Sequence, residues 1–286
     1  MLMFESALTE GAVLADALLL QTSQAELLGR IRNDALLSAS LWVNVALAGL
    51  SVLLFVYMGR SVQSPRAKLI WGATLLIPLV SLSSYLGLLS GLTVGLIEMP
   101  PGHALEGEMV LSQWGRYLTW ALSTPLILLA LGLLADVDRS DLLVVIAADI
   151  GMCLTGLAAA LTTSSYAFRW AFYLVSCSFF VVVLYALLAE WPAAAEAAGT
   201  DDIFGTLRTL TVVLWLGYPI IWAVGVEGFA LVQSVGITSW GYSALDVLAK
   251  YVFAYLLLRW VADNQDTVER ANAGAVGTGA GAPADD

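Results

Sequence analysis

Long uncharged apolar stretches make up most of the chain. Five of them contain no acidic or basic residue and cover 41–58, 69–97, 117–135, 170–189 and 209–226. Two more, 142–168 and 228–258, are interrupted only by Asp149 and by Asp246 with Lys250. About 20 apolar residues in an α-helix cross a hydrocarbon core about 30 Å thick, and a helix satisfies its own backbone in lipid. We therefore predict an all-α membrane protein that folds as a bundle of seven transmembrane helices.

The composition agrees with this class. Hydrophobic residues make up 59% of the 286 residues and charged residues only 12%, about half the share that is usual in a soluble domain. The net charge of -11 argues against a nucleic-acid partner, because a phosphate binder needs a basic face. The two cysteines, Cys153 and Cys177, lie inside predicted helices and are expected to be small buried hydrophobes rather than a disulfide framework.

The apolar stretches divide the chain into three regions. Residues 36–265 are expected to form the membrane domain. Residues 1–35 are only partly apolar and are predicted to be an exposed extracellular segment. Residues 266–286 end in a run rich in glycine and alanine with an acidic end, which predicts a disordered cytoplasmic tail.

The connections between the spans predict the orientation in the membrane. The longer ones are expected at 59–68, 98–115 and 190–206. Arg60, Arg66 and Lys68 lie in the first of them, and basic loops stay on the cytoplasmic side. Seven spans then place the amino terminus outside and the carboxyl terminus inside, as expected for a multi-pass protein of the cell membrane.

Lys250 is an unusual residue for the interior of a membrane helix. It lies near the middle of the last span, too deep for its side chain to reach the interface. Asp246 precedes it by four residues and shares its helix face. The two residues are either a structural ion pair between helices or part of a reactive site. A lysine in an apolar pocket loses its proton easily and can form a Schiff base with an aldehyde.

An aromatic stripe on the neighbouring span favours the reactive amine. Trp215, Tyr218 and Trp222 follow one another at spacings that put them on one helix face, and Trp120 lies on another span. Pro219 interrupts the hydrogen bonding of the same helix and is expected to kink it. Such stripes are usually core packing. Beside a central amine, however, a flat aromatic slot suits a long conjugated aldehyde.

Three segments make the chain similar to a known family. RYLTWALSTP at 116–125, WLGYPIIW at 215–222 and LDVLAKY at 245–251 resemble the microbial rhodopsins, and among these most closely the halorhodopsins, the light-driven chloride pumps. The resemblance covers about residues 36–265 and implies that the seven helices enclose all-trans retinal. It further implies a homotrimer in membrane lipid.

The resemblance assigns roles to individual residues. Lys250 would carry retinal as a protonated Schiff base, and Asp246 would be part of its counterion. The positions that match the retinal pocket are Trp120, Thr124, Met152, Gly156, Ser176, Phe180, Trp215, Tyr218 and Trp222. Tyr173 and Cys177 fall at pocket positions where family members vary. Arg208 and Thr211 match the cytoplasmic anion path, although Arg208 also suits an interfacial arginine.

The span at 117–135 favours an anion over a proton as the transported ion. Arg116, Thr119 and Ser123 share one helix face. Proton pumps of the family carry carboxylates at the positions of Thr119 and Ala130, and neither threonine nor alanine titrates.

A count of charges gives the same preference. The Schiff base and Arg116 are positive and Asp246 is negative, so one positive charge remains in a low-dielectric site. One chloride would neutralise it, with hydroxyl donors from Thr119 and Ser123. We therefore predict a light-driven inward chloride pump with a bound chloride beside Arg116. The hydroxyls also suit ordinary contacts between membrane helices.

Three other functions remain open at this point: a sensory rhodopsin, a light-gated anion channel, and a seven-helix receptor for a diffusible ligand. No enzyme motif or zinc motif is present, and His103 has no ligand cluster around it in the sequence. Asp149 is expected to be a protonated acid bonded across helices, with Thr124 as a candidate partner. Glu227 suits either the entrance of the anion path or an interfacial cap. No metal and no soluble protein partner are expected.

Overall fold

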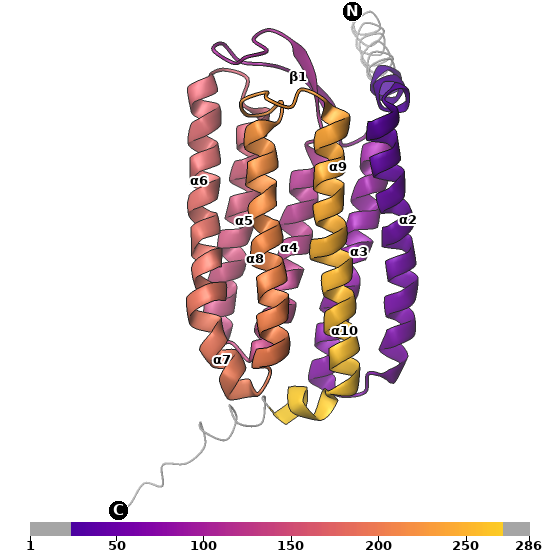
Figure 1. The fold of residues 1–286 in the computed structure, drawn as a ribbon, viewed down its shortest axis with the longest axis vertical. Coiled ribbons are helices and arrows are strands. Elements are labelled where there is room, and N and C mark those ends of the chain that lie inside the picture. The colour runs from indigo at the N-terminus through magenta and orange to yellow at the C-terminus, as the bar shows by residue number, and fades with distance from the viewer. Residues whose placement is uncertain (1–23, 271–286) are drawn as a thin grey trace, which may run out of the picture.

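The computed structural model describes residues 24–270 and contains seven membrane-crossing rods (Figure 1). The first six are α2 (Ala35–Met58), α3 (Pro65–Leu89), α4 (Gly115–Ala135), α5 (Arg139–Leu161), α6 (Tyr166–Tyr185) and α8 (Asp201–Val224). The seventh runs without a break through α9 (Val235–Asp246), the π-helical turn η3 (Val247–Val252) and α10 (Phe253–Asp263). The predicted bundle of seven helices is confirmed. By length and apolar composition, the first six rods each qualify as membrane spans. The seventh contains the charged residues Asp246 and Lys250.

The helix boundaries correct several of the predicted ones, and the stretch 142–168 is one helix only to Leu161. The stretch 69–97 is helical only to Leu89, because Gly91 takes a left-handed conformation (φ 76°) and the chain turns into a strand. The last rod starts at Val235 and not at 228. The Ser234 side chain caps this start by accepting a hydrogen bond from the amide of Ile237. The expected connection 190–206 is largely helical. α6 continues through η2 (Ala186–Glu190) into α7 (Trp191–Ala198), and α8 follows after two residues.

A two-stranded hairpin occupies the connection between α3 and α4, and the sequence analysis did not predict it. β1 (Gly95–Glu98) pairs antiparallel with β2 (Met109–Ser112), with Gly95 opposite Ser112. The amide of Gly115 donates to the Thr93 carbonyl at 3.0 Å, and a side chain at Gly115 would collide with Thr93. The hairpin therefore fixes the start of α4, one residue before Arg116.

The two ends of the described part of the chain add short helical segments to the bundle. Residues 24–33 are helical, and Ile31 packs with Leu37, Leu41 and Tyr85 in a buried cluster. Residues 265–270 are also helical, and Gln265 accepts hydrogen bonds from the amides of Gln63 and Ser64 before α3. The other parts of the predicted terminal segments, 1–23 and 271–286, lie outside the described residues.

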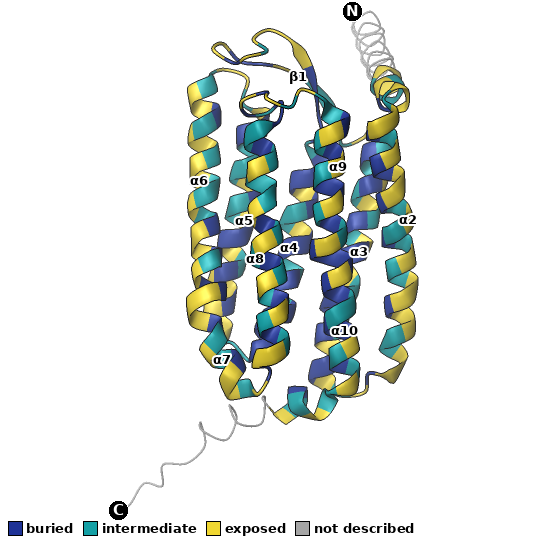
Figure 2. Ribbon diagram, in the orientation of Figure 1, coloured by how far each residue is buried: buried dark blue, intermediate teal, exposed yellow. Residues whose placement is uncertain are grey.

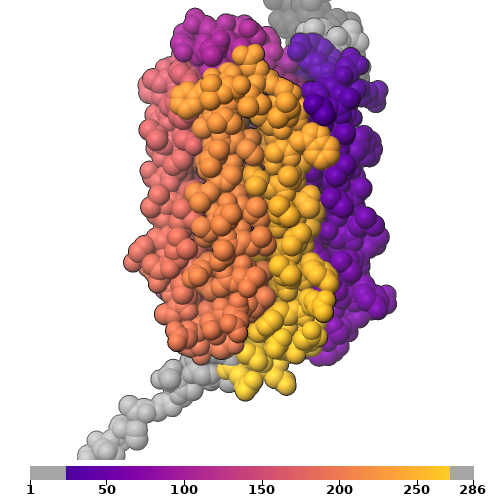
Figure 3. Space-filling model, viewed as in Figure 1, coloured from indigo at the N-terminus to yellow at the C-terminus, as the bar shows by residue number. Residues whose placement is uncertain are grey.

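The outer faces of the rods are apolar, as a lipid environment requires. Figure 2 shows exposed positions along the outward faces of the rods and buried ones toward the interior. Leu53, Leu69, Leu122 and Val181 are each more than 60% exposed. On the face shown in Figure 3, side chains fill the spaces between the ribbons of α6, α8 and α10. Lipid chains would cover these outward side chains.

Arg66 joins the start of α3 to the end of α4. Its Nε and Nη2 donate to the Leu133 carbonyl at 3.0 and 2.6 Å, and Nη2 lies 2.6 Å from Oδ1 of Asp136. Asp136 ends α4 in a left-handed conformation (φ 56°). The guanidinium thus supplies a donor to a carbonyl at the end of a helix, where the backbone lacks its own partner.

Replacing Arg66 by alanine should lower the free energy of unfolding by about 2–3 kcal/mol, because a buried carbonyl and a carboxylate lose their donor together. Thermal unfolding in detergent, followed by circular dichroism, measures the change. Arg30→Ala is the matched control, since Arg30 pairs with Glu26 on the exposed surface, and such pairs contribute about 0–1 kcal/mol. Equal destabilisation by both substitutions would contradict the assignment.

Candidate functional site

Lys250 lies in the π-helical turn η3 and is buried, with 1% of its surface exposed. Its Nζ lies 2.9 Å from Oδ1 of Asp246. Within residues 24–270 this nitrogen makes no well-oriented hydrogen bond. A π-helical turn is uncommon and often marks a functional site. The predicted pairing of Lys250 with Asp246 is therefore present, and the amine retains hydrogen-bonding capacity.

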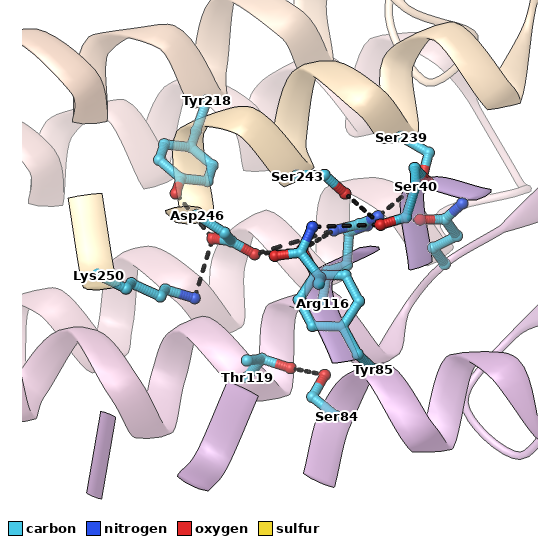
Figure 4. Close-up of polar contacts among 12 residues, drawn as sticks. Ser40, Ser84, Tyr85, Arg116, Thr119, Tyr218, Ser239, Ser243, Asp246 and Lys250 are labelled. Carbon is cyan, nitrogen blue, oxygen red and sulfur yellow. Dashed lines mark hydrogen bonds and ion pairs between the residues drawn. The ribbon is translucent and has the colours of Figure 1, made fainter. Parts of the chain in front are cut away.

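Two tyrosines hold the Asp246 carboxylate (Figure 4). The Tyr218 hydroxyl donates to Oδ1 at 2.8 Å, and the Tyr85 hydroxyl donates to Oδ2 at 2.7 Å. Tyr218 was expected only as a pocket residue, and Tyr85 was missed by the sequence analysis. A lone tyrosine within an apolar span carries no pattern that distinguishes it from core packing. These contacts fix the carboxylate in position.

Arg116 lies beside this carboxylate but is held mainly by other groups. Nη1 donates to the Tyr85 hydroxyl at 3.0 Å, Nη2 donates to Ser239 at 2.8 Å, and Nε donates to Gln113. The distance from Nη1 to Oδ2 of Asp246 is 4.0 Å. Gln113 and Ser239 were not anticipated. The guanidinium is thus close to Asp246 without forming a direct hydrogen bond to it.

The hydroxyls of Thr119 and Ser123 lie on the same face of α4 as Arg116. Thr119 is hydrogen-bonded to Ser84 on α3 and also donates to the Gly115 carbonyl at 2.9 Å. The Oγ of Ser123 is buried and has no hydrogen-bond partner among residues 24–270. Ser84 was not predicted. The sequence prediction that these hydroxyls are available to a ligand fits Ser123 best.

An aromatic cavity adjoins the charged cluster. It is lined by all nine predicted pocket residues, Trp120, Thr124, Met152, Gly156, Ser176, Phe180, Trp215, Tyr218 and Trp222. Tyr173 and Cys177 also line it, together with Tyr117, Cys153, Pro219 and Tyr242, which were not proposed for the pocket.

The rings around this cavity are packed against one another. Tyr173 stacks on Trp222 with ring centroids 4.6 Å apart, and Trp120 meets Tyr218 edge-on at 5.1 Å. Tyr218 connects the two parts of the site, because its ring lines the cavity while its hydroxyl binds Asp246. The cavity therefore suits a flat apolar group, and Tyr218 and Asp246 connect it to Lys250.

Asp149 has the partner that was expected for it. The Thr124 hydroxyl lies 2.7 Å from Oδ2 of Asp149 and 2.8 Å from the Trp120 carbonyl. Asp149 is fully buried and has no ion pair within the described part of the chain. This carboxyl group thus lies behind the cavity and joins α4 to α5.

The predicted cytoplasmic pair, Arg208 and Thr211, does not form a hydrogen-bonded unit. Thr211 is buried and donates to the Leu207 carbonyl of its own helix at 2.9 Å. Arg208 is half-buried, and its Nε has no partner among residues 24–270. A buried apolar cluster that includes Leu128, Leu131, Trp215, Phe253 and Leu257 fills much of this half of the bundle.

The opposite half of the bundle, toward the hairpin, contains several buried polar side chains beside its apolar clusters. Tyr117 donates to Oε2 of Glu227 at 2.7 Å, and Nε of Arg169 donates to the Glu227 carbonyl at 2.7 Å. Tyr117 and Arg169 thus hold Glu227 inside this end of the bundle, so Glu227 is not a free residue at the interface. His103 lies nearby, edge-on to Tyr166, and burial beside Arg169 lowers the pKa of its imidazole. No cluster of three or more metal-ligating side chains occurs within 24–270.

Comparisons with known proteins agree with this geometry. The family model described as bacteriorhodopsin-like protein matches residues 35–264. A halorhodopsin of Haloterrigena sp. (strain arg-4) is 75% identical over 256 residues, which cover 88% of this chain and 86% of the relative.

Two solved structures are similar along most of their length. A bromide-bound form of halorhodopsin from Halobacterium salinarum is 75% identical, with a TM-score of 0.82, over 84% of this chain and 99% of that one. A structure described as halorhodopsin, a light-driven chloride pump, is 76% identical, with a TM-score of 0.81, over 82% of this chain and 98% of that one.

Proposed function

Since the chain belongs to the bacteriorhodopsin-like family, alongside the halorhodopsins, we propose that it is a light-driven pump that moves chloride into the cell. The observation that carries the proposal is the balance of charges around Lys250. Lys250, Arg116 and Asp246 are buried together, and their two positive charges face one carboxylate.

The unbalanced charge selects the transported ion. Thr119 and Ser123 supply hydroxyls near the cluster but no carboxylate. One monovalent anion restores neutrality, and burying the cluster without it is costly. Chloride bound beside Arg116, within reach of the Ser123 and Thr119 hydroxyls, satisfies both requirements. The bromide-bound form of the 75% identical halorhodopsin supports halide binding.

The residues present fit retinal as the light-absorbing group. Lys250 offers a buried Nζ that lacks a well-oriented hydrogen bond, and the adjoining cavity is aromatic and apolar. When bound to Nζ, retinal would supply light absorption and a change of shape. Trp222, Trp120 and Tyr173 would hold it flat, and Asp246 would stabilise the positive charge at the nitrogen.

The two halves of the bundle support alternating access. The half toward the hairpin holds the polar residues Arg116, Gln113 and Glu227 among its apolar side chains, whereas the other half is closed by the apolar cluster around Leu131 and Phe253. Beyond Lys250, on the way to Arg208 and Thr211, an anion would meet this apolar cluster. Movement of α8 at Pro219 would have to open the apolar half before the anion reaches Arg208 and Thr211.

The distribution of basic residues supports the proposed orientation. Seven of the twelve Lys and Arg residues lie near the end of the bundle that contains the 59–64 connection: Arg60, Arg66, Lys68, Arg139, Arg208, Arg259 and Arg270. Arg30, Arg32 and Arg169 lie near the other end. Because basic residues are retained on the cytoplasmic side, the hairpin is extracellular and α10 ends in the cytoplasm. A homotrimer in lipid is part of the same proposal.

Vesicles or cells that contain the protein and retinal test this function directly. Illumination should drive chloride inward and let protons follow passively, so a protonophore should increase the alkalinisation outside. The measurements are external pH and photocurrent. Abolition of the pH change by the protonophore would indicate active proton transport instead. A current that flows only down the chloride gradient would indicate a channel, and a coloured protein without any transport would indicate a sensor.

A further inference from the structure

A chain of buried hydroxyls runs from Arg116 to the first membrane helix. Nη2 of Arg116 donates to Ser239 of α9 at 2.8 Å, and Ser239 Oγ lies 2.7 Å from Ser40 Oγ of α2. Ser40 Oγ in turn donates to the Leu37 carbonyl at 2.8 Å. Ser40 and Ser239 are both at most 1% exposed. Figure 4 shows the two side chains beside Arg116.

One arrangement of hydroxyl protons satisfies every bond in this chain. A serine hydroxyl has one proton to donate. Ser40 uses its proton toward Leu37, so in the contact between the two serines Ser239 is the donor and Ser40 the acceptor. Ser239 is then free to accept from Arg116. Each hydroxyl donates once and accepts once, and chains of this kind strengthen each of their bonds.

This chain acts on the arrangement of Arg116 relative to Asp246. Nη1 stops 4.0 Å short of the carboxylate, with the Tyr85 hydroxyl bonded to both groups. Opposite charges so close in a low-dielectric interior attract strongly. A direct guanidinium–carboxylate pair would satisfy Arg116 internally and leave it a weaker partner for an anion. Ser239 and Gln113 hold the guanidinium from the other side.

We propose that Ser239, and through it Ser40, are positioning residues of the anion site, which keep the Arg116 guanidinium apart from Asp246 and directed toward chloride. The proposal rests on the chloride site described above. Helix α2 contributes no residue to the cavity or to the Asp246 hydrogen bonds. Through Ser40, the proposal makes α2 a contributor to anion affinity.

The test is a chloride titration of the visible absorption band in retinal-reconstituted protein. Ser239→Ala should raise the Kd of chloride about tenfold, because a hydrogen bond to a charged group is lost. Ser40→Ala should raise it by a smaller factor, about threefold, since Ser239 keeps its bond to Arg116 but loses the acceptor for its own proton. Ser239→Thr keeps the hydroxyl and should retain a Kd close to that of the unaltered protein.

The double variant separates positioning from packing. If Ser40 acts through Ser239, adding Ser40→Ala to Ser239→Ala should change the Kd no further, whereas independent effects would multiply. Asn44→Ala is the matched control, because Asn44 donates to the Ser40 carbonyl from within the same buried interface and does not touch Arg116. It should leave the Kd unchanged.

The outcomes distinguish this inference from the proposed function. An unaltered protein whose spectrum ignores chloride would overturn the chloride site itself. With a chloride-sensitive protein, a Kd in Ser239→Ala within twofold of the original would overturn the positioning role. So would an equal rise in Asn44→Ala, or multiplicative effects in the double variant. If Ser239→Ala forms no pigment, the chloride Kd of Ser40→Ala decides instead. A rise of about threefold supports the positioning role, and an unchanged Kd overturns it.

Discussion

Replacing Lys250 by arginine should give a folded protein that stays colourless with retinal and transports nothing in the light. A guanidinium remains charged at every accessible pH and does not form a stable bond to an aldehyde. It nevertheless retains a positive charge beside Asp246, whose Oδ1 lies 2.9 Å from Nζ of Lys250 in the unaltered protein. Lys250→Ala lacks that advantage, because removing one partner of a buried pair costs about 3–5 kcal/mol. The arginine variant therefore tests the chemistry of the amine rather than its charge.

The measurement is the visible absorption spectrum after addition of retinal, with circular dichroism to establish helical content. The chain provides its own control, since its other lysine, Lys68, is exposed near the start of α3. Lys68→Arg should form the same amount of pigment as the unaltered protein. A visible band in Lys250→Arg, or loss of the band in Lys68→Arg, would refute the assignment of the covalent site.

Helical periodicity was sufficient to predict the parts of the site that lie on one element. The spacing of Asp246 and Lys250 predicted their contact, and the stripe of Trp215, Tyr218 and Trp222 predicted one wall of the cavity. The bundle itself followed from the length of the apolar stretches. Such features depend on short-range geometry, which a 3.6-residue repeat fixes.

Apart from the local contact of Gln113 with Arg116, the contacts to Arg116 and Thr119 that were missed from the sequence join elements that are distant along the chain. On α3, Tyr85 and Ser84 lie 31 and 35 residues away from their partners on α4. On α9, Ser239 lies 123 residues away from Arg116. Single hydroxyls within apolar spans have no periodic signal, and their partners depend on how the helices pack. The hairpin was missed for a related reason, since its pairing joins the two ends of a loop that has no alternating pattern.

Thr119→Asp should remove most of the chloride affinity at neutral pH. Thr119 is buried on the Arg116 face of α4, and a carboxylate there supplies the negative charge that the cluster lacks. Two like charges about 4 Å apart repel by about 4 kcal/mol at an effective dielectric constant of about 20. Even half of that, about 2 kcal/mol, weakens binding about thirtyfold. The absorption band should become almost independent of chloride, and some light-driven proton transport should appear, because the new group can accept a proton.

Acidification separates the effect of the introduced charge on chloride affinity from the effect of the changed side-chain shape. Protonation of the introduced carboxylate restores the positive excess, so chloride affinity should return as the pH falls through the pKa of that group. Thr119→Asn is the matched control, since its amide has nearly the same shape without a charge, and its chloride Kd should lie far below that of the aspartate variant at neutral pH. A chloride Kd in Thr119→Asp within threefold of the original at neutral pH would show that charge balance does not select the ion.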